Sequence, residues 1–139
     1  MKNYMEMRFS ASLKNVIFAR GAVASFLLEQ DLRLNVINEI KTIVSEAVTN
    51  AIVHGYRNNP DEMVFLSLLL ENNKLTITIS DTGVGIEDIE KAKEPLFSTR
   101  EEEERAGLGF TIMDIFSDSL DIWSEVGKGT TIISSKIFD

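Results

Sequence analysis

Residues 34–54 restrict the fold of this chain more than any other segment. At about 100° per residue, one broad arc of a helix over this range collects its apolar side chains. These are Val36, Ile37, Ile40, Ile43, Val44, Ala47, Val48, Ala51 and Ile52. Gly55 follows as a helix stop. A helix with so wide an apolar face has to be covered along its length, which predicts a second layer of structure.

The rest of the chain supplies elements for that layer. Two apolar or β-branched runs are joined by Asn72-Asn73 and predict a β-hairpin. Strands are expected at 4–9, 63–70, 75–80, 120–125 and 130–138, and helices at 12–30, 34–54, 87–93 and 107–116. Ser10 or Ser12 is the expected cap of the first helix. The order predicts one domain over residues 1–139 with an α+β fold: a two-layer sandwich of a mixed β-sheet with helices on one face.

Composition excludes several classes of function. The 139 residues include no cysteine, which excludes disulfides and thiolate metal sites. The net charge of -8, from 14 basic and 22 acidic residues, argues against nucleic acid as a direct partner. Residues 1–9 lack the apolar core of a signal peptide. No apolar run approaches the ~20 residues that span a bilayer, so we expect no membrane association and a cytoplasmic location.

A polar edge runs beside the apolar arc of residues 34–54. Glu46 and Asn50 are four residues apart and therefore neighbours on the helix surface, with Glu39 on the same edge. An amide oxygen suits magnesium, and a carboxylate beside it can take a proton from an attacking hydroxyl. Taken alone, the pair is better explained as a solvated edge. His54 falls inside the arc and is expected to be packed rather than catalytic.

Glycine-rich loops follow two of the expected elements. Asp81 stands at a strand end, where its carboxylate can accept a hydrogen bond from an exocyclic amine, and Gly83 and Gly85 allow backbone to pass close to a flat base. Gly107-Leu108-Gly109 is expected to open a helix, whose free N–H groups favour phosphate. Each pattern is common in proteins and is weak evidence in isolation.

The segment 94–106 is polar, contains Pro95 and carries four consecutive glutamates. We interpret it as a mobile loop that closes over the phosphates, with the glutamates solvated. Arg105 is closest to the glycines and is the better candidate than Arg100 for contact with a terminal phosphate. The P-loop, the dinucleotide-binding fingerprint and the eukaryotic protein-kinase signature are absent from the sequence.

In this order, the segments closely resemble the ATP-binding domain shared by gyrase, gyrase-type heat-shock chaperones, mismatch-repair ATPases and sensor histidine kinases. Glu46–Asn50, Asp81–Ile86 and Gly107–Phe110 correspond to its N box and two glycine boxes. The resemblance implies that Asp81 binds the adenine amine, that Asn50 coordinates Mg²⁺, and that Gly107 and Gly109 lie at the phosphates of ATP. Lys128-Gly129-Thr130 matches a stretch near the adenine.

Within that superfamily, Glu46 corresponds to the general base of the ATPases and serine kinases, a position where sensor histidine kinases usually lack a carboxylate. The chain is much shorter than the gyrase-like enzymes. It is most similar to the free-standing serine/threonine kinases that act as anti-sigma factors. Among these kinases, it resembles the sporulation group more closely than the general-stress group. This resemblance implies a homodimer and two competing partners, a sigma factor and an anti-anti-sigma protein phosphorylated on serine.

The first expected helix offers an interaction surface. Its apolar arc comprises Leu13, Val16, Ile17, Ala24, Leu27 and Leu28 and is extended by Ala19, Val23 and Phe26. Arg20 lies inside this wide arc. It can extend past a buried face into water, or it can belong to a protein interface, where arginine is enriched. The resemblance places a partner-contacting arginine in this region and favours the second interpretation.

Overall fold

The computed structural model describes residues 2–92 and 101–138, without the side chains of residues 91 and 101–107. Its strands are β1 (Lys2–Ser10), β2 (Met63–Glu71), β3 (Lys74–Asp81), β4 (Ser119–Glu125) and β5 (Gly129–Ile137). Its α-helices are α1 (Asn15–Phe26), α2 (Leu34–Asn50), α3 (Ile89–Ala92) and α4 (Glu101–Phe116). A 3₁₀ turn, η1 (Leu28–Gln30), follows α1, and a π-helical turn, η2 (Ala51–Gly55), continues α2.

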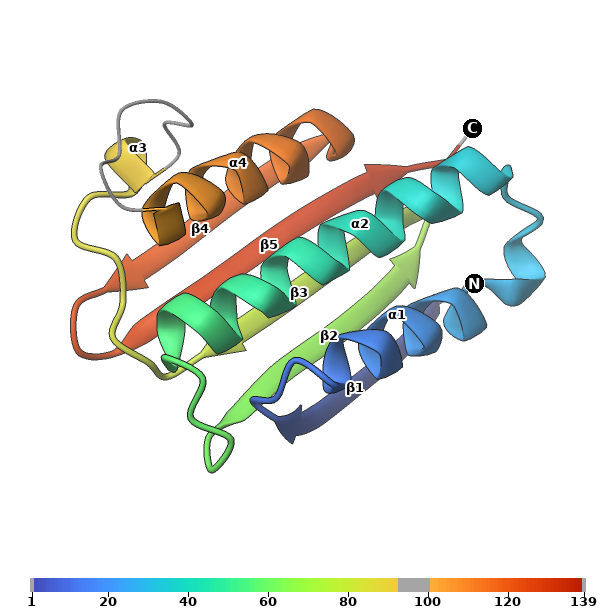
Figure 1. The fold of residues 1–139 in the computed structure, drawn as a ribbon. Coiled ribbons are helices and arrows are strands. Elements are labelled where there is room, and N and C mark those ends of the chain that lie inside the picture. Colours follow the sequence, from blue (N-terminus) through green and yellow to red (C-terminus); the bar gives the residue numbers. More distant parts are fainter. Residues whose placement is uncertain (1, 93–100, 139) are drawn as a thin grey trace.

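The strands form one sheet in the order β1-β2-β3-β5-β4. Helices α1, α2 and α4 lie side by side on one face of it, with α2 in the middle (Figure 1). This arrangement confirms the predicted α+β sandwich with helices on one face. The predicted Asn72-Asn73 hairpin is also confirmed, because both asparagines have the positive φ angles, 54° and 59°, that such a tight turn requires.

The prediction of a mixed sheet is wrong, because all four neighbouring strand pairs are antiparallel. The helical crossover from β3 to β4 does make these two strands run in the same direction. They are not neighbours, however, because β5 returns from β4 as a hairpin and inserts between them. The parallel strands are thus separated by an antiparallel one.

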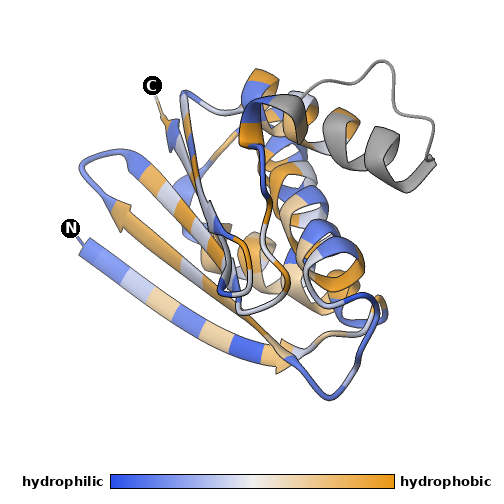
Figure 2. Cartoon of the chain, turned by 90° about the vertical axis from the view of Figure 1, so that its left-hand side faces the viewer, coloured by the Kyte–Doolittle hydropathy of each residue, from blue (hydrophilic) through white to orange (hydrophobic). Residues whose placement is uncertain are grey.

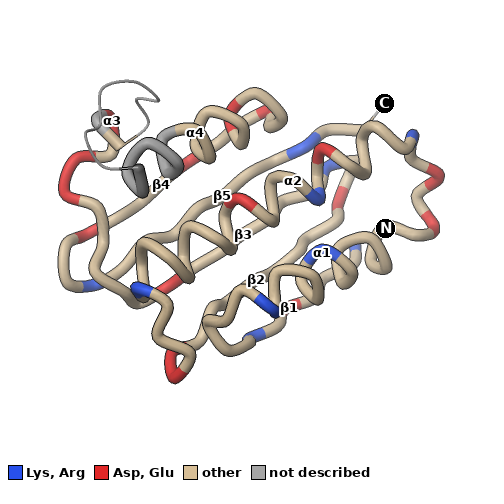
Figure 3. Tube along the Cα trace, in the orientation of Figure 1, with Lys and Arg blue, Asp and Glu red and all other residues tan. Residues whose placement is uncertain are grey.

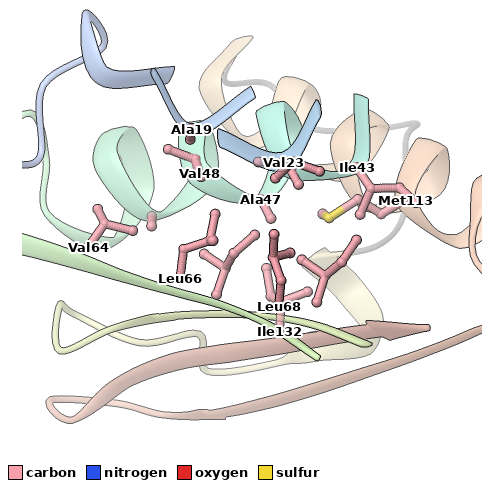
Figure 4. Close-up of a cluster of buried hydrophobic side chains, with 14 of the residues drawn as sticks. Ala19, Val23, Ile43, Ala47, Val48, Val64, Leu66, Leu68, Met113 and Ile132 are labelled. Carbon is pink, nitrogen blue, oxygen red and sulfur yellow. The ribbon is translucent and has the colours of Figure 1, made fainter. Parts of the chain in front are cut away.

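The core fills the space between the sheet and α2. Alternate residues of β2 and β3 face the helices, and the buried side of α2 is the predicted arc from Ile40 to Ile52. Figure 4 shows part of this core, in which side chains of β2 and β5 meet those of α1, α2 and α4. The labelled residues are Val64, Leu66, Leu68, Ile132, Ala19, Val23, Ile43, Ala47, Val48 and Met113. The alternation of hydrophilic and hydrophobic residues is visible along β1 at the edge of the sheet (Figure 2).

The first helix differs from the prediction in length and orientation. It begins at Asn15 with no side-chain cap from Ser10 or Ser12, and Asp31 ends the following turn in a left-handed conformation with φ 50°. Ala19, Val23 and Leu27 are buried, whereas Ile17 is 74% exposed and Leu28 is 81% exposed. Ala19 and Val23, which the sequence predicts only as an extension of the arc, therefore lie at its buried centre, because a helix at the side of the helical layer buries only the stripe that faces the core.

The helix predicted to open at Gly107 begins instead at Glu101. Glutamate, arginine and alanine are good helix formers, and acidic residues favour the first turn of a helix, so the segment before the glycines is helical. The prediction of a loop is therefore wrong for residues 101–106, and the remainder of the predicted loop, 94–100, lies outside the described residues. Gly107 and Gly109 stand inside α4 rather than at its first turn.

Candidate functional site

Two helices meet at the polar edge of α2. A Cβ atom added to Gly109 of α4 would lie 2.9 Å from Glu46 Oε2 and 3.4 Å from Asn50 Nδ2. The backbone of α4 therefore lies directly against these two side chains, and a larger residue at position 109 would displace the Glu46 carboxylate. The predicted pair on α2 and Gly109 of the second predicted glycine segment form one group of residues.

Asn50 has an unfilled hydrogen-bonding requirement. Its Nδ2 atom is buried and has no partner among the described residues. A buried amide nitrogen without a partner is costly, and rotation of the amide by 180° places its oxygen at the same position. The site therefore fits an external group that meets the Asn50 amide, either an acceptor for its nitrogen or a cation for its oxygen.

Glu46 lies one turn before Asn50 and is half-buried. Burial raises the pKa of the Glu46 carboxyl above its usual value, because the charged form is poorly solvated there. A carboxylate with a raised pKa is a stronger base than an exposed glutamate, which suits proton abstraction near neutral pH.

A second group of residues surrounds Asp81 at the end of β3. Asp81 is buried, and its Oδ1 accepts a hydrogen bond of 2.9 Å from the Gly83 N–H. Burial raises the pKa of the Asp81 carboxyl, and hydrogen bonds from the backbone of Gly83 and Thr130 oppose that rise. A buried carboxylate held by backbone donors is a fixed acceptor for a ligand N–H group.

Close backbone contacts shape the loop after Asp81. A Cβ on Gly83 would lie 2.0 Å from the Gly55 carbonyl oxygen, so only glycine allows the loop to approach η2. Gly85 has φ +76°, and a Cβ there would lie 2.2 Å from the Glu125 carbonyl oxygen. The predicted Asp81–Gly85 loop is thus packed between the end of α2 and the β4–β5 turn.

Thr130 of β5 pairs with Asp81 and is buried beside it. Its Oγ1 lies 2.8 Å from Ser124 Oγ, and Ser124 Oγ accepts a 2.7 Å hydrogen bond from the Ile86 N–H. Ser124 was not predicted, because an isolated serine in a strand carries no recognisable pattern. The β4–β5 hairpin therefore supports the loop through side chains as well as backbone.

The other predicted residues lie elsewhere or outside the described side chains. Leu108 is on α4, and its side chain is exposed. The backbone of Arg105 and Gly107 also belongs to α4, but the Arg105 side chain lies outside the described residues. Arg20 is on α1, which packs on the opposite side of α2 from α4 (Figure 1), so it is separate from the two groups around Glu46 and Asp81.

Comparison with known proteins identifies this arrangement. The profile of the histidine kinase-like ATPase domain matches residues 9–136. The chain belongs to the histidine kinase-like ATPase family. Both groups of site residues lie within the matched range, and the match supports ATP as the ligand of this ATPase-family domain.

Individual relatives of this ATPase-family chain are anti-sigma F factors. One from Geobacillus sp. (strain WCH70) is 50% identical over 136 residues, which are 98% of this chain and 93% of the relative. Another, from Bacillus velezensis (strain DSM 23117 / BGSC 10A6 / LMG 26770 / FZB42), is 51% identical with the same coverage. The expected resemblance to the anti-sigma factors of this family is confirmed.

The fold is shared with a solved structure. The crystal structure of the RsbU and RsbW domains of a Mycobacterium tuberculosis protein aligns with a TM-score of 0.69 at 16% identity, over 97% of this chain and 32% of that one. Among the described residues of this histidine kinase-like ATPase, none of the helices is long and apolar enough to cross a membrane. Within the same residues, no cluster of three or more His, Cys, Asp or Glu side chains could hold a metal ion.

Proposed function

We propose that this chain is an anti-sigma factor that binds and inhibits an RNA-polymerase sigma factor in the control of sporulation transcription. We propose further that it is an ATP-dependent protein serine kinase that phosphorylates and inactivates the anti-anti-sigma antagonist. The observation that carries the kinase proposal is the half-buried Glu46 beside the unpartnered amide of Asn50, under the backbone of Gly109. A protein that only bound nucleotide would need no base at this position.

The two groups of residues divide the nucleotide between them in this proposal. Asp81 accepts a hydrogen bond from the adenine amine, and Gly83, Gly85 and Thr130 form the walls around the base. Gly107, Leu108 and Gly109 lie at the phosphates, on the helix that faces Glu46 and Asn50. The support is the buried, fixed carboxylate at one end of η2 and the α2–α4 contact at the other.

Asn50 is the proposed protein ligand of Mg²⁺. Its buried amide without a partner fits a hard cation whose other ligands are phosphate oxygens and water, the arrangement magnesium prefers. The absence of an acidic cluster among the described residues is compatible with such a site, because magnesium bound with nucleotide needs few protein ligands. When bound, the ion would neutralise phosphate charge.

Glu46 acts as the general base in the proposed reaction. Its carboxylate takes the proton from the substrate serine hydroxyl while the serine oxygen forms a bond to the γ-phosphorus. The bond from that phosphorus to the bridging oxygen breaks, and ADP leaves. Arg105 is proposed to contact the terminal phosphate, where charge is spread over the transferred group.

The test is transfer of labelled phosphate from ATP to a candidate anti-anti-sigma protein, followed by identification of the labelled residue. We expect magnesium-dependent labelling of one serine. Two alternative functions predict other results. A nucleotide-dependent binding switch would bind both partners with ATP present and transfer no phosphate. A general-stress anti-sigma kinase would label the general-stress antagonist in preference to the sporulation antagonist.

The proposed partner surface lies on α1. Ile17 and Phe18 are 74% and 68% exposed, and Arg20 beside them is exposed as well. A small pocket between α1 and α2 is lined by Ile17, Arg20, Gly21 and Lys41. An apolar surface with two cations suits a partner that presents apolar and acidic side chains together.

Arg20→Glu should weaken binding of both the sigma factor and the anti-anti-sigma protein by at least about tenfold, because reversing a charge inside an interface puts like charges together. ATP affinity should be unchanged, since Arg20 is on the other side of α2 from Gly109. Pull-down titrations with each partner and calorimetry with ATP measure the two effects.

Lys74→Glu is the matched control for Arg20→Glu, because it reverses one exposed positive charge at the β2–β3 turn. It should leave both partners bound normally. If Arg20→Glu behaves like this control, the two partners do not share the α1 surface.

We also propose that the chain forms a homodimer, through the face of the sheet that the helices leave uncovered. That face carries exposed large side chains near both ends of the strand order: Tyr4 on the edge strand β1, Trp123 on the edge strand β4, and Ile133 on the neighbouring β5. Sedimentation equilibrium at micromolar concentration should give twice the chain mass; a mass of 15.6 kDa would contradict the proposal.

A further inference from the structure

We propose that Tyr56 is a positioning residue that fixes the direction of the Asp81 carboxylate and thereby sets the preference of this site for adenine. The inference rests on the proposed nucleotide site and assigns a role to a residue that does not itself contact the base. Tyr56 follows η2 directly and is 7% exposed.

The Tyr56 hydroxyl group connects the start of β2 to the loop that follows β3. It donates a 2.7 Å hydrogen bond to the Met63 carbonyl oxygen at the start of β2. It also accepts a 2.8 Å hydrogen bond from the Thr82 N–H, and the Thr82 hydroxyl lies 3.3 Å away. Both the donor and the acceptor capacity of the phenol are thus used.

The Thr82 N–H belongs to the peptide group that follows Asp81. Asp81 is the last residue of β3 paired with β5, so the ladder no longer fixes the chain beyond it. Beyond the ladder, the bond to Tyr56 orients this peptide group, whose carbonyl oxygen packs against Gly129. The next two residues depend on it, because Gly83 donates back to the Asp81 carboxylate and Val84 donates a 3.0 Å hydrogen bond to the Gly55 carbonyl oxygen.

The π turn places Tyr56 where it can make these bonds. Tyr56 N–H donates a 2.9 Å hydrogen bond to the Ala51 carbonyl oxygen, and this wider turn changes the direction in which the next side chain leaves the helix. Gly55 lies against Asp81 in the same turn, since a Cβ on it would be 2.8 Å from the carboxyl group. Local π-helical turns are frequent at functional sites, and this one connects Asn50 to the proposed adenine acceptor.

The test compares the affinities of ADP and inosine diphosphate, which has a carbonyl oxygen where adenine has its amine. The wild-type protein should prefer ADP, because a fixed carboxylate accepts from the amine and repels the carbonyl. Tyr56→Phe keeps the buried ring and removes only the hydroxyl. We expect it to weaken ADP binding about tenfold and inosine diphosphate binding little, so that the preference for ADP falls about tenfold.

Ser134→Ala is the matched control. Ser134 is 1% exposed and hydrogen-bonded to Ser117, so the substitution also removes a buried hydroxyl, but far along β5 from Asp81. It should lower the melting temperature while leaving the preference for ADP unchanged.

The outcomes separate this inference from the proposed function. An unchanged preference in Tyr56→Phe, with ADP binding lost in Asp81→Asn, would overturn the role of Tyr56 alone. Unchanged ADP binding in Asp81→Asn would overturn the adenine site itself. If Tyr56→Phe does not fold, hydrogen exchange of the Thr82 amide in the wild-type protein decides the matter: protection without nucleotide supports the bond to Tyr56, and rapid exchange contradicts it.

Discussion

Glu46→Gln should keep the affinity for ATP and magnesium and lower phosphotransfer to the serine substrate by roughly 10²–10⁴-fold, the usual contribution of a general base. Glutamine has nearly the same shape, so it preserves the contact between Glu46 and the backbone at Gly109. It cannot accept the proton of the attacking hydroxyl. Binding and turnover should therefore separate, which calorimetry and single-turnover labelling measure.

Glu39→Gln is the matched control, because Glu39 is on the same helix but is bonded to Lys136 at 2.6 Å. Its turnover should stay near the wild-type value. Normal turnover in Glu46→Gln with nucleotide still bound would show that Glu46 is not the base.

The pH dependence of turnover and of stability, compared between the wild-type protein and Glu46→Gln, gives a second test of the role of Glu46. Burial raises the pKa of Glu46, so wild-type turnover should fall on the acid side at a higher pH than an exposed glutamate would give. Because the pKa of the Glu46 carboxyl is higher in the folded than in the unfolded protein, protonation of this group contributes to stability. The contribution is complete below the unfolded-state pKa and is lost as the pH rises through the folded-state pKa. Glu46→Gln should consequently be the more stable protein at neutral pH, with the difference vanishing in acid.

Asn50→Ala should abolish magnesium-dependent nucleotide binding while the fold remains intact. Loss of residues that merely support a metal ligand already costs 10–100-fold in affinity, so loss of the ligand itself should cost more than about 100-fold. The fold should survive, because the buried Nδ2 of Asn50 makes no hydrogen bond within the described residues. Its removal even eliminates a buried polar group without a partner.

Calorimetry with ATP, with and without magnesium, measures the effect of Asn50→Ala, and circular dichroism confirms folding. Asn38→Ala, at an exposed position of the same helix, is the matched control and should bind as the wild type does. Equal affinity for ATP and magnesium in the two variants would remove Asn50 from the site.

Much of the scaffold could be predicted because its signals are local. The apolar arc of α2 fixes which side of the helix is buried, and alternation along β2 and β3 fixes which side of the sheet faces it. Asn72-Asn73 specifies a tight turn by its own backbone preference. Glu46 and Asn50 were brought together by helical spacing alone, which needs no knowledge of the rest of the molecule.

The predictions that were wrong, and the residues that the sequence did not reveal, depend on contacts between distant segments. The antiparallel sheet follows from the insertion of β5 between β3 and β4, which no local pattern encodes. The exposed side of α1 depends on how many neighbours that helix has. Tyr56 and Ser124 act through hydrogen bonds to residues 26 and 38 positions away, so neither carries a signal in its own segment.

The position of β5 between β3 and β4 has a consequence for how the protein is made. Thr130, which lies beside Asp81, is on β5, the last of these five strands to be synthesised, and β4 pairs with the rest of the sheet only through β5. Until β5 has left the ribosome, β3 exposes an unpaired edge, and such edges favour aggregation. We therefore expect the proposed nucleotide site to form in one late step, when the β4–β5 hairpin closes the sheet.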